Sequence, residues 1–284
     1  MPKPSEVVVN QGRLYHLGVA PEEVARSIFL VGDPQRAYRV AARFDSIDHE
    51  VKNREYVTIT GVFRGVAMSV VGTGIGTDNV EIAMIELDAA NGIDLGTGLR
   101  RAGTGPLDMI RIGTSGGVQP EVPAGTLCNA EYALGLDSTG IYYEFPTGDP
   151  LAAEIEREAK RLLDEASTPA ARFGGRLPVY ASKADPAVSA ALVRQAEKAG
   201  VPLASGITVS SPGFYGPSSR YIEGLVNTVP AIKGTLAKLD VDGRQVLNME
   251  MESSLLFHLA AALGHRAGTI CPAISQPGSQ AALV

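Results

Sequence analysis

Short apolar runs alternate with helix-like segments along this 284-residue chain, and this alternation limits the fold more than any other feature. Runs such as 27–31 and 66–71 end in glycine-containing turns, and stretches with apolar residues at helical spacing follow them. Strands that alternate with helices indicate an α/β domain. Because no Pro-, Ser- or charge-rich linker divides the chain, we expect one domain over residues 1–284.

The same patterns predict the individual elements. Strands are expected at 27–31, 56–60, 66–71, 109–112, 245–249 and 266–274, and helices at 35–44, 151–165, 186–199 and 252–263. A further helix begins near Asp78, which we expect to be its N-cap. The stretches 95–106 and 167–176 are predicted to be loops, and we interpret both as insertions.

The composition excludes several classes of function. A formal net charge of −6 argues against general nucleic-acid binding, which needs a basic face. The cysteines and histidines show none of the spacings typical of metal sites, so no essential metal is expected. The N-terminus lacks an apolar signal region, and no apolar run approaches the length of a bilayer. We therefore expect a cytoplasmic protein that binds neither membranes nor nucleic acid.

Three segments at predicted strand ends carry candidate binding residues, because ligands of open α/β sheets bind at the carboxyl ends of strands. In the first segment, Gly32 and Arg36 flank the turn at Asp33-Pro34. The Gly32 amide and the forked Arg36 guanidinium suit an anion such as phosphate at a helix N-terminus. The alternative is ordinary turn chemistry, since Gly and Pro are common turn residues.

The second segment places an arginine inside an apolar strand. Arg111 lies within Met109-Ile110-Arg111-Ile112 and would be costly to bury without an anionic partner. The glycine-rich turn that follows exposes backbone amides, and Thr114 adds a hydroxyl. We interpret the segment as an anion site, and the alternative is a partly exposed arginine on an edge strand.

The third segment places Glu250 and Glu252 between an apolar strand and an apolar helix. Negative charge is favourable at a helix N-terminus, and this is the structural explanation. The functional explanation is a carboxylate that accepts hydrogen bonds from vicinal hydroxyls, while Met251 packs against a sugar face. Because side chains alternate along extended backbone, we expect one of the two glutamates to dominate the sugar contact.

Several short motifs follow one another in a fixed order. They are Tyr15-His16-Leu17-Gly18, Val31-Gly32-Asp33-Pro34-Gln35-Arg36, Asn53-Arg54-Glu55-Tyr56, Thr73-Gly74-Ile75-Gly76, Ile110-Arg111-Ile112-Gly113-Thr114, Phe214-Tyr215 with Arg220-Tyr221, and Met249-Glu250-Met251-Glu252-Ser253. Together they make the chain resemble the nucleoside phosphorylase family, in its uridine phosphorylase branch. The resemblance implies a mixed central β-sheet, partly barrel-like, with flanking helices.

The resemblance also implies a role for each matching residue. The residues matched to phosphate binding are Gly32, Arg36, Arg54, Arg111 and Thr114. Those matched to ribose are His16, Glu250, Met251 and Glu252, and those matched to the base are Phe214, Ser218 and Arg220. His16 and Arg54 would act in a neighbouring subunit, so we expect a dimer-based homo-oligomer, in this family usually a hexamer. Some family members bind a potassium ion through a glutamate that matches Glu55, and no other cofactor is implied.

The implied reaction is phosphorolysis, in which uridine and inorganic phosphate, the co-substrate, give uracil and ribose 1-phosphate. The chain would thus be a pentosyltransferase of pyrimidine salvage. Arg111 would hold phosphate beneath C1′, Glu252 would fix the sugar hydroxyls, and Arg220 would stabilise negative charge on the base. We assign catalysis to these three residues.

Three positions differ from the family pattern. Ser218 stands where a glutamine reads the uracil edge, and Pro277 stands where a second arginine is expected. Ser275 matches an aspartate that protonates purines in the purine branch. The absence of this aspartate favours a pyrimidine nucleoside as the substrate. No counterpart of the family's C-terminal helix is recognised.

Three alternatives to a uridine phosphorylase remain. They are a purine nucleoside phosphorylase, a nucleosidase of the same fold, which would need no arginines for phosphate, and a catalytically silent nucleoside-binding protein.

Overall fold

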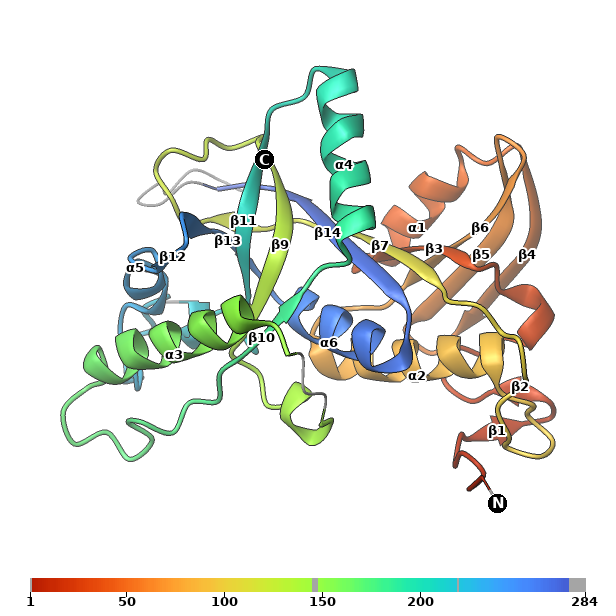
Figure 1. Ribbon diagram of the computed structural model, residues 1–284, viewed down its shortest axis with the longest axis horizontal. Helices are drawn as coiled ribbons and strands as arrows, with labels where there is room; N and C mark the ends of the chain where they lie inside the picture. The colour runs from red at the N-terminus through yellow and green to blue at the C-terminus, as the bar shows by residue number, and fades with distance from the viewer. Residues whose placement is uncertain (1, 145–147, 219, 276–284) are drawn as a thin grey trace.

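A mixed sheet of twelve strands forms the centre of the computed structural model, which describes residues 2–144, 148–218 and 220–275 (Figure 1). The main path of the sheet is β12 (Asp240–Val241), β13 (Arg244–Glu250), β11 (Leu203–Ser210), β9 (Leu127–Gly135), β14 (Arg266–Pro272), β7 (Asp108–Ile112), β3 (Ser27–Val31), β6 (Val66–Gly72), β5 (Tyr56–Phe63) and β4 (Ser46–Asn53). Off this path, β10 (Tyr180–Lys183) pairs with β9, and β8 (Gly116–Gly117) pairs with β13. The expected mixed sheet is confirmed, but its path has two ends, so the described strands form no closed barrel.

β14 joins two half-sheets along this path. It runs parallel to β7, in register from Arg266 opposite Asp108 to Ile270 opposite Ile112, and antiparallel to β9. β7, β3 and β6 are parallel on one side of it, and β9, β11 and β13 are parallel on the other. The strand direction therefore reverses at the β14–β9 pair, in the middle of the sheet.

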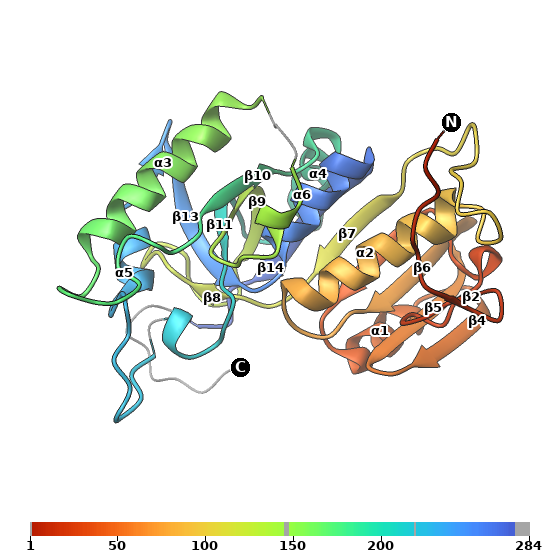
Figure 2. The same cartoon turned by 90° about the horizontal axis from the view of Figure 1, so that it is seen from below.

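Helices cover both faces of the half-sheet that contains β3, β5 and β6. In β6, Val71 packs in the apolar cluster of α2 (Thr77–Gly92), whereas its neighbour Val70 packs in the cluster of α1 (Pro34–Ala41). Because successive side chains of a strand point to opposite faces, α1 and α2 lie on opposite sides of this half-sheet. α6 (Ser253–Leu263) lies beside α2, as Figures 1 and 2 show.

The other half-sheet packs against α3 (Pro150–Glu165) and the short α5 (Ile232–Leu236), while α4 (Pro186–Ala199) covers β14 and β9. Three helices begin at an Asp-Pro pair. Asp33, Asp149 and Asp185 accept hydrogen bonds from first-turn amides of α1, α3 and α4. The proline that follows each aspartate needs no amide partner at this position, so the pair determines where the helix begins.

Most predicted elements are present, with ends that differ by a few residues. The helix expected at 35–44 ends at Ala41. Asp78 is not an N-cap, because α2 begins at Thr77 after Gly76, whose φ of 98° suits glycine. β4, β9 and β11 were not predicted, and the stretches 95–106 and 167–176 contain none of the helices or sheet strands. Within the described ranges no helix is long and apolar enough to cross a membrane.

Candidate active site

Arg111 is buried at the centre of the candidate site. Its strand β7 lies between β14 and β3, so the alternative of an edge-strand arginine is wrong. The side chain is 7% exposed, and its guanidinium forms ion pairs with Glu252 and with Glu250, the latter at 3.2 Å between Nη1 and Oε2. Nη1 also donates to Cys271 Sγ at 3.2 Å. Burial raises the pKa of Cys271 to about 12, so this thiol is a neutral neighbour of the arginine.

The protein itself supplies the anionic partners that burial of Arg111 requires. Burial alone would lower the pKa of Arg111, but Glu252 and Glu250 hold it above its ordinary value. Burial raises the pKa of the Glu252 carboxyl, Arg111 lowers it, and the charge of Glu250 raises it again. One guanidinium faces two carboxylates, so the cluster carries excess negative charge when all three groups are ionised. A further anion at this place, such as phosphate, needs further cations.

Glu250 and Glu252 differ in their remaining partners. The Glu250 carboxylate accepts hydrogen bonds from the first backbone amides of α6 at 3.0 to 3.2 Å and from Ser210 Oγ at 2.6 Å. The helix-terminus explanation is therefore confirmed for Glu250. Besides Arg111, Glu252 accepts from the backbone amide of Gly76 at 2.8 Å. Glu252 thus retains more acceptor capacity than Glu250 for a ligand.

Gly32, Arg36 and Thr114 lie around the end of the strand that carries Arg111. Arg36, in the first turns of α1, donates from Nη1 to the carbonyl of Ile112 at 3.2 Å. Gly32 directly follows β3, the neighbour of β7. Thr114 is exposed two residues after β7. The structure therefore brings these three predicted phosphate residues together at one end of β3 and β7.

The residues predicted to contact the base share the loop 211–220 that follows β11. The Arg220 guanidinium lies over the Phe214 ring, with 3.7 Å between Cζ and the ring centroid, and donates to the Phe214 carbonyl. Ser218 ends the 3-10 helix η3 (Gly216–Ser218), and its Oγ lies 3.3 Å from Ser211 Oγ. The Ser211 amide donates to the Glu250 carbonyl at 2.8 Å. This loop is therefore anchored beside the carboxylates, while Pro277 lies outside the described residues.

His16 and Arg54 form a second cluster, at the surface. His16 Nδ1 lies 2.7 Å from Glu86 of α2, and the His16 side chain is 29% exposed. Arg54, exposed in the turn between β4 and β5, donates to the Tyr15 hydroxyl at 3.0 Å. The Tyr15 and His16 rings meet edge to face at 5.0 Å between centroids. In the part of the chain that the structure describes, no hydrogen bond or ion pair connects this cluster with Arg111.

Sequence reasoning missed some residues that hold the site in place. Ser210 ends a strand that the patterns did not predict, and the role of Gly76 is carried by a backbone amide. Glu86 is buried in α2 and accepts hydrogen bonds from the amides of His16 and Leu17. A charged residue among the apolar positions of 77–92 was the signal that could have identified Glu86.

A sequence model of the phosphorylase superfamily matches residues 26–281 of the chain. The matched region contains β3, β7, β13 and α6, which carry the Arg111 cluster. The chain belongs to the phosphorylase superfamily. This superfamily member is 32% identical to the uridine phosphorylase of Thermococcus kodakarensis over 261 residues, which cover 92% of the chain and 76% of the relative. It is also 27% identical to the uridine phosphorylase of Salmonella typhimurium over 271 residues, or 94% of the chain and 87% of the relative.

The fold of this superfamily member is also similar to a solved structure. A Trypanosoma brucei nucleoside phosphorylase that shows uridine phosphorylase activity superposes with a TM-score of 0.84 at 27% sequence identity. The superposition covers 97% of this chain and 92% of the other. The match in fold therefore extends over nearly the whole chain.

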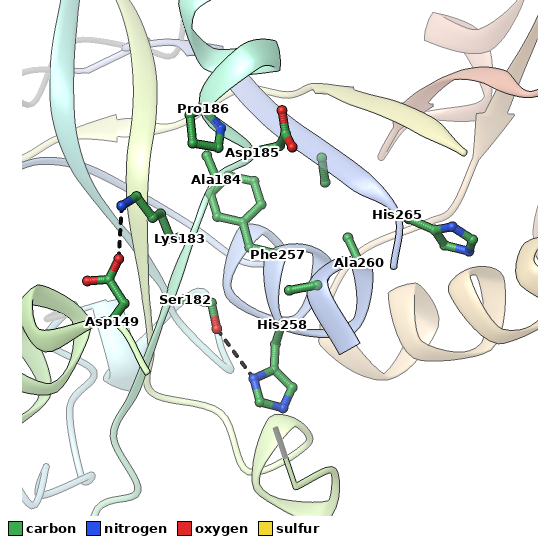
Figure 3. Close-up of a pocket in the computed structure, with 12 residues that line it drawn as sticks. Asp149, Ser182, Lys183, Ala184, Asp185, Pro186, Phe257, His258, Ala260 and His265 are labelled. Carbon is green, nitrogen blue, oxygen red and sulfur yellow. Dashed lines mark hydrogen bonds and ion pairs between the residues drawn. The ribbon is translucent and has the colours of Figure 1, made fainter. Parts of the chain in front are cut away.

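Figure 3 shows a pocket of this superfamily member, of about 310 Å³, whose lining includes none of Arg111, Glu250 and Glu252. Its lining includes Ser182, Lys183, His258 and His265, so it lies toward the C-terminal part of α6, whereas the glutamates precede the N-terminus of that helix. His258 Nδ1 lies 3.4 Å from Ser182 Oγ, and Nε2 lies 2.7 Å from the carbonyl of Tyr143. Both imidazole nitrogens thus have partners within the fold, and we assign the superfamily's chemistry to the other end of α6.

Proposed function

We propose that the chain is a uridine phosphorylase, which uses inorganic phosphate to cleave uridine into uracil and ribose 1-phosphate. The observation that carries this proposal is the buried cluster of Arg111, Glu250 and Glu252, together with the Arg36 guanidinium on the carbonyl of Ile112, the residue after Arg111. Guanidinium groups suit phosphate, and a carboxylate suits a pair of sugar hydroxyls. Similarity to a uridine phosphorylase over 92% of the chain supports this assignment.

In this proposal, phosphate binds between Arg36 and Arg111, and the Gly32 amide and the Thr114 hydroxyl complete its site. Phosphate then competes with Glu252 for the Arg111 guanidinium. This competition releases acceptor capacity of Glu252 for the ribose hydroxyls, so binding of the two substrates is coupled. The excess of carboxylates over Arg111 gives a physical reason why Arg36 is needed as well.

Glu250 and Met251 support the sugar site in different ways. Glu250 holds the start of α6 through its contacts with backbone amides, so it fixes the backbone that carries Glu252. Met251, which is partly buried between the two glutamates, supplies an apolar surface for the ribose ring. Glu252 makes the dominant contact with the hydroxyls.

During the reaction a phosphate oxygen forms a bond to C1′ while the bond from C1′ to N1 of uracil breaks. The bonding electrons leave with the base, and the base later takes a proton from solvent. Phosphate opposes the positive charge that develops on the ribose, and Arg220, held over Phe214, opposes the negative charge on uracil. The reaction needs no side-chain nucleophile. Ser218 contributes a hydroxyl to the base loop.

His16 and Arg54 are proposed to act in the site of a neighbouring subunit, on the ribose 5′-hydroxyl and on phosphate. Their position in a separate surface cluster supports this sharing. The working unit is then a dimer, and we propose a cytoplasmic hexamer of three dimers. A structural potassium ion is proposed near Glu55. No three described His, Cys, Asp or Glu side chains are grouped to hold a metal ion.

The proposed reaction is tested by incubating the purified protein with uridine, thymidine, cytidine, inosine, adenosine and guanosine, with and without phosphate. Free base and ribose 1-phosphate are measured by chromatography. We expect release of uracil only with phosphate. Base release without phosphate would identify a nucleosidase, and preferential purine release would identify a purine phosphorylase. Binding of nucleoside without any turnover, in an assembled oligomer, would identify a silent binding protein.

Two arginines of α1 offer a matched pair of variants for the phosphate site. Arg36 contacts the end of β7, whereas the side chain of Arg39 is 76% exposed. We expect Arg36→Ala to raise the KM for phosphate by about tenfold or more, and Arg39→Ala to leave it unchanged. Equal phosphate KM values in the two variants would refute the assignment of Arg36.

A further inference from the structure

Asp137 is a buried carboxylate that has no part in the proposed reaction. It lies two residues after β9 and is 2% exposed. Its Oδ2 accepts hydrogen bonds from the Tyr180 hydroxyl at 2.7 Å and from Ser254 Oγ at 3.0 Å. Its Oδ1 accepts from the backbone amides of Thr139 at 2.9 Å and Gly140 at 3.4 Å. Four neutral donors thus stabilise a charge that is costly to bury, and they tie β10, α6 and the loop after β9 together.

Two glycines leave the space in which the Tyr180 ring lies. An added Cβ would lie 2.4 Å from ring atom Cε1 if built on Gly135, and 2.4 Å from Cζ if built on Gly140. Gly135 is also the residue of β9 that pairs with Tyr180 of β10. Burial raises the pKa of Tyr180 and the charge of Asp137 raises it further, so the hydroxyl keeps its proton. The ring is therefore confined at a place from which it donates to Asp137.

One path of contacts leads from Asp137 to Glu252 through α6. Ser254, which binds the Asp137 carboxylate, is the second residue of this helix, and Glu252 directly precedes the helix. The Ser254 amide donates to Ser210 Oγ at 2.9 Å, and that hydroxyl donates to Glu250 at 2.6 Å. The first turn of α6 is thus held by Asp137 through a side chain and by Glu250 through the backbone. This path fixes the backbone of Glu252.

A second path leads to Glu252 through α2. The loop residue Thr139 donates its amide to Asp137, and its Oγ1 lies 3.2 Å from Oγ1 of Thr77, the first residue of α2. The residue before Thr77 is Gly76, whose amide donates to the Glu252 carboxylate at 2.8 Å. The two paths from Asp137 therefore converge on the same glutamate, one at its backbone and the other at its carboxylate.

We propose that Asp137 is a positioning residue of the sugar site, which aims the Glu252 carboxylate at the ribose hydroxyls by holding the N-termini of α2 and α6 in place. A carboxylate that accepts from two vicinal hydroxyls must be held in one orientation, and a small misplacement slows the reaction. Asp137 itself contacts neither substrate. This inference rests on the proposed phosphorolysis of uridine, in which Glu252 binds the hydroxyls.

The test is a double-mutant cycle on kcat/KM for uridine. Asp137→Asn keeps the size of the side chain, but it removes the charge and turns one acceptor into a donor. Glu252→Gln removes the carboxylate that Asp137 positions. We expect Asp137→Asn to lower kcat/KM by a factor on the order of ten in the wild type. In the Glu252→Gln background the loss should be less than about twofold, because the group to be positioned is gone. An equal loss in both backgrounds would show a general structural role and overturn the proposal.

Two milder variants interrupt one path each. Ser254→Ala removes the contact of α6 with Asp137, and Thr139→Val removes the contact with Thr77. Each should lower kcat/KM for uridine by less than Asp137→Asn does, and each loss should disappear in the Glu252→Gln background. If Asp137→Asn does not fold, these two variants decide the question by the same cycle. The matched control is Ser69→Ala, since Ser69 is also buried and hydrogen-bonded but lies in β6. Its kcat/KM should equal that of the wild type.

Calorimetry with uridine and with uracil separates this inference from the proposed function. Asp137→Asn should weaken the binding of uridine by about tenfold and leave the binding of uracil, which has no hydroxyls, unchanged. This comparison holds even if the wild type releases no uracil with phosphate, the result by which the proposed function fails. Equal weakening for both ligands, or no weakening for uridine, would overturn the role of Asp137 alone. A wild type that does not bind uridine would overturn both.

Discussion

Replacing Arg111 with methionine would leave two carboxylates buried without their shared counter-charge. Removal of one partner from a buried ion pair costs about 3–5 kcal/mol of folding stability. The remaining donors decide where this loss arises. Glu250 keeps the Ser210 hydroxyl and the first amides of α6, whereas Glu252 keeps, among the described residues, the amide of Gly76. We therefore expect most of the loss to arise at Glu252.

Second substitutions separate the two carboxylates. The double variant Arg111→Met/Glu252→Gln removes the carboxylate that keeps the fewer hydrogen-bond donors. Its free energy of unfolding should exceed that of Arg111→Met by about 1–3 kcal/mol. Arg111→Met/Glu250→Gln should regain less, because it also weakens the cap of α6. Acidification should act like Glu252→Gln. Since burial raises the pKa of Glu252, the penalty for its charge is complete above that raised pKa and decreases as the pH falls through it toward the ordinary pKa of a glutamate.

Urea unfolding at about pH 8 and about pH 5.5, at one protein concentration, measures these differences. Arg266→Met is the control, since it removes an exposed ion pair with Asp108 and should cost less than about 1 kcal/mol. Arg111→Met should lose about 2–4 kcal/mol of transition-state stabilisation, so its rate of uridine turnover should fall roughly 30- to 1,000-fold. An unchanged unfolding midpoint at about pH 8, or greater recovery with Glu250→Gln, would refute the reasoning.

Three further changes test other contacts. Gly113→Ala places a Cβ in the space of the Arg111 guanidinium, so kcat/KM for uridine should fall by about tenfold or more. Burial raises the pKa of Glu252 above its ordinary value of 4.5, so kcat/KM of the wild type should fall on the acid side at a pH above 4.5. Glu252→Gln should abolish this fall. Both profiles are measured at a constant concentration of phosphate dianion. Glu86→Ala should lower Tm and reduce the free energy of unfolding by about 1–3 kcal/mol, because the amide of His16 loses its acceptor.

Each of these changes has a control or a contrary result. Gly234→Ala should be neutral, since an added Cβ there meets nothing within 4 Å, and equal activity of Gly113→Ala would show that Arg111 has room to move. A wild-type profile that stays flat down to pH 4.5 would contradict the raised pKa of Glu252. An unchanged Tm in Glu86→Ala would mean that water replaces the carboxylate.

Local patterns in the sequence predicted much of the fold. The apolar run at 27–31 and the helix at 186–199 occur at the predicted positions, because apolar periodicity and an Asp-Pro start are local properties. β9 and β11 contain small and polar residues such as Asn129 and Gly206, which packing inside the sheet accommodates. Local patterns do not show such strands. They also do not show that the strand direction reverses between β14 and β9.

The sequence indicated which residues belong to the candidate site, but not which of them contact one another. Arg111 and the glutamates were identified because charge inside an apolar context is costly and demands a partner. That the partner would be the glutamates depends on how β7 and α6 meet, which no spacing in the sequence records. Alternation along extended backbone also did not show that Glu250 and Glu252 both form ion pairs with Arg111.

The position of β14 has a consequence for how the protein is made. A ribosome releases the segments of both half-sheets before it releases residues 266–272, yet this strand lies between β7 and β9. Each half can begin to form during synthesis, but their pairing along the main path must wait for residues 266–272, which follow all the other strands in the sequence. Long-range pairing of this kind is slow, so ribosome-bound chains should expose two unpaired sheet edges to chaperones and proteases until residues 266–272 emerge.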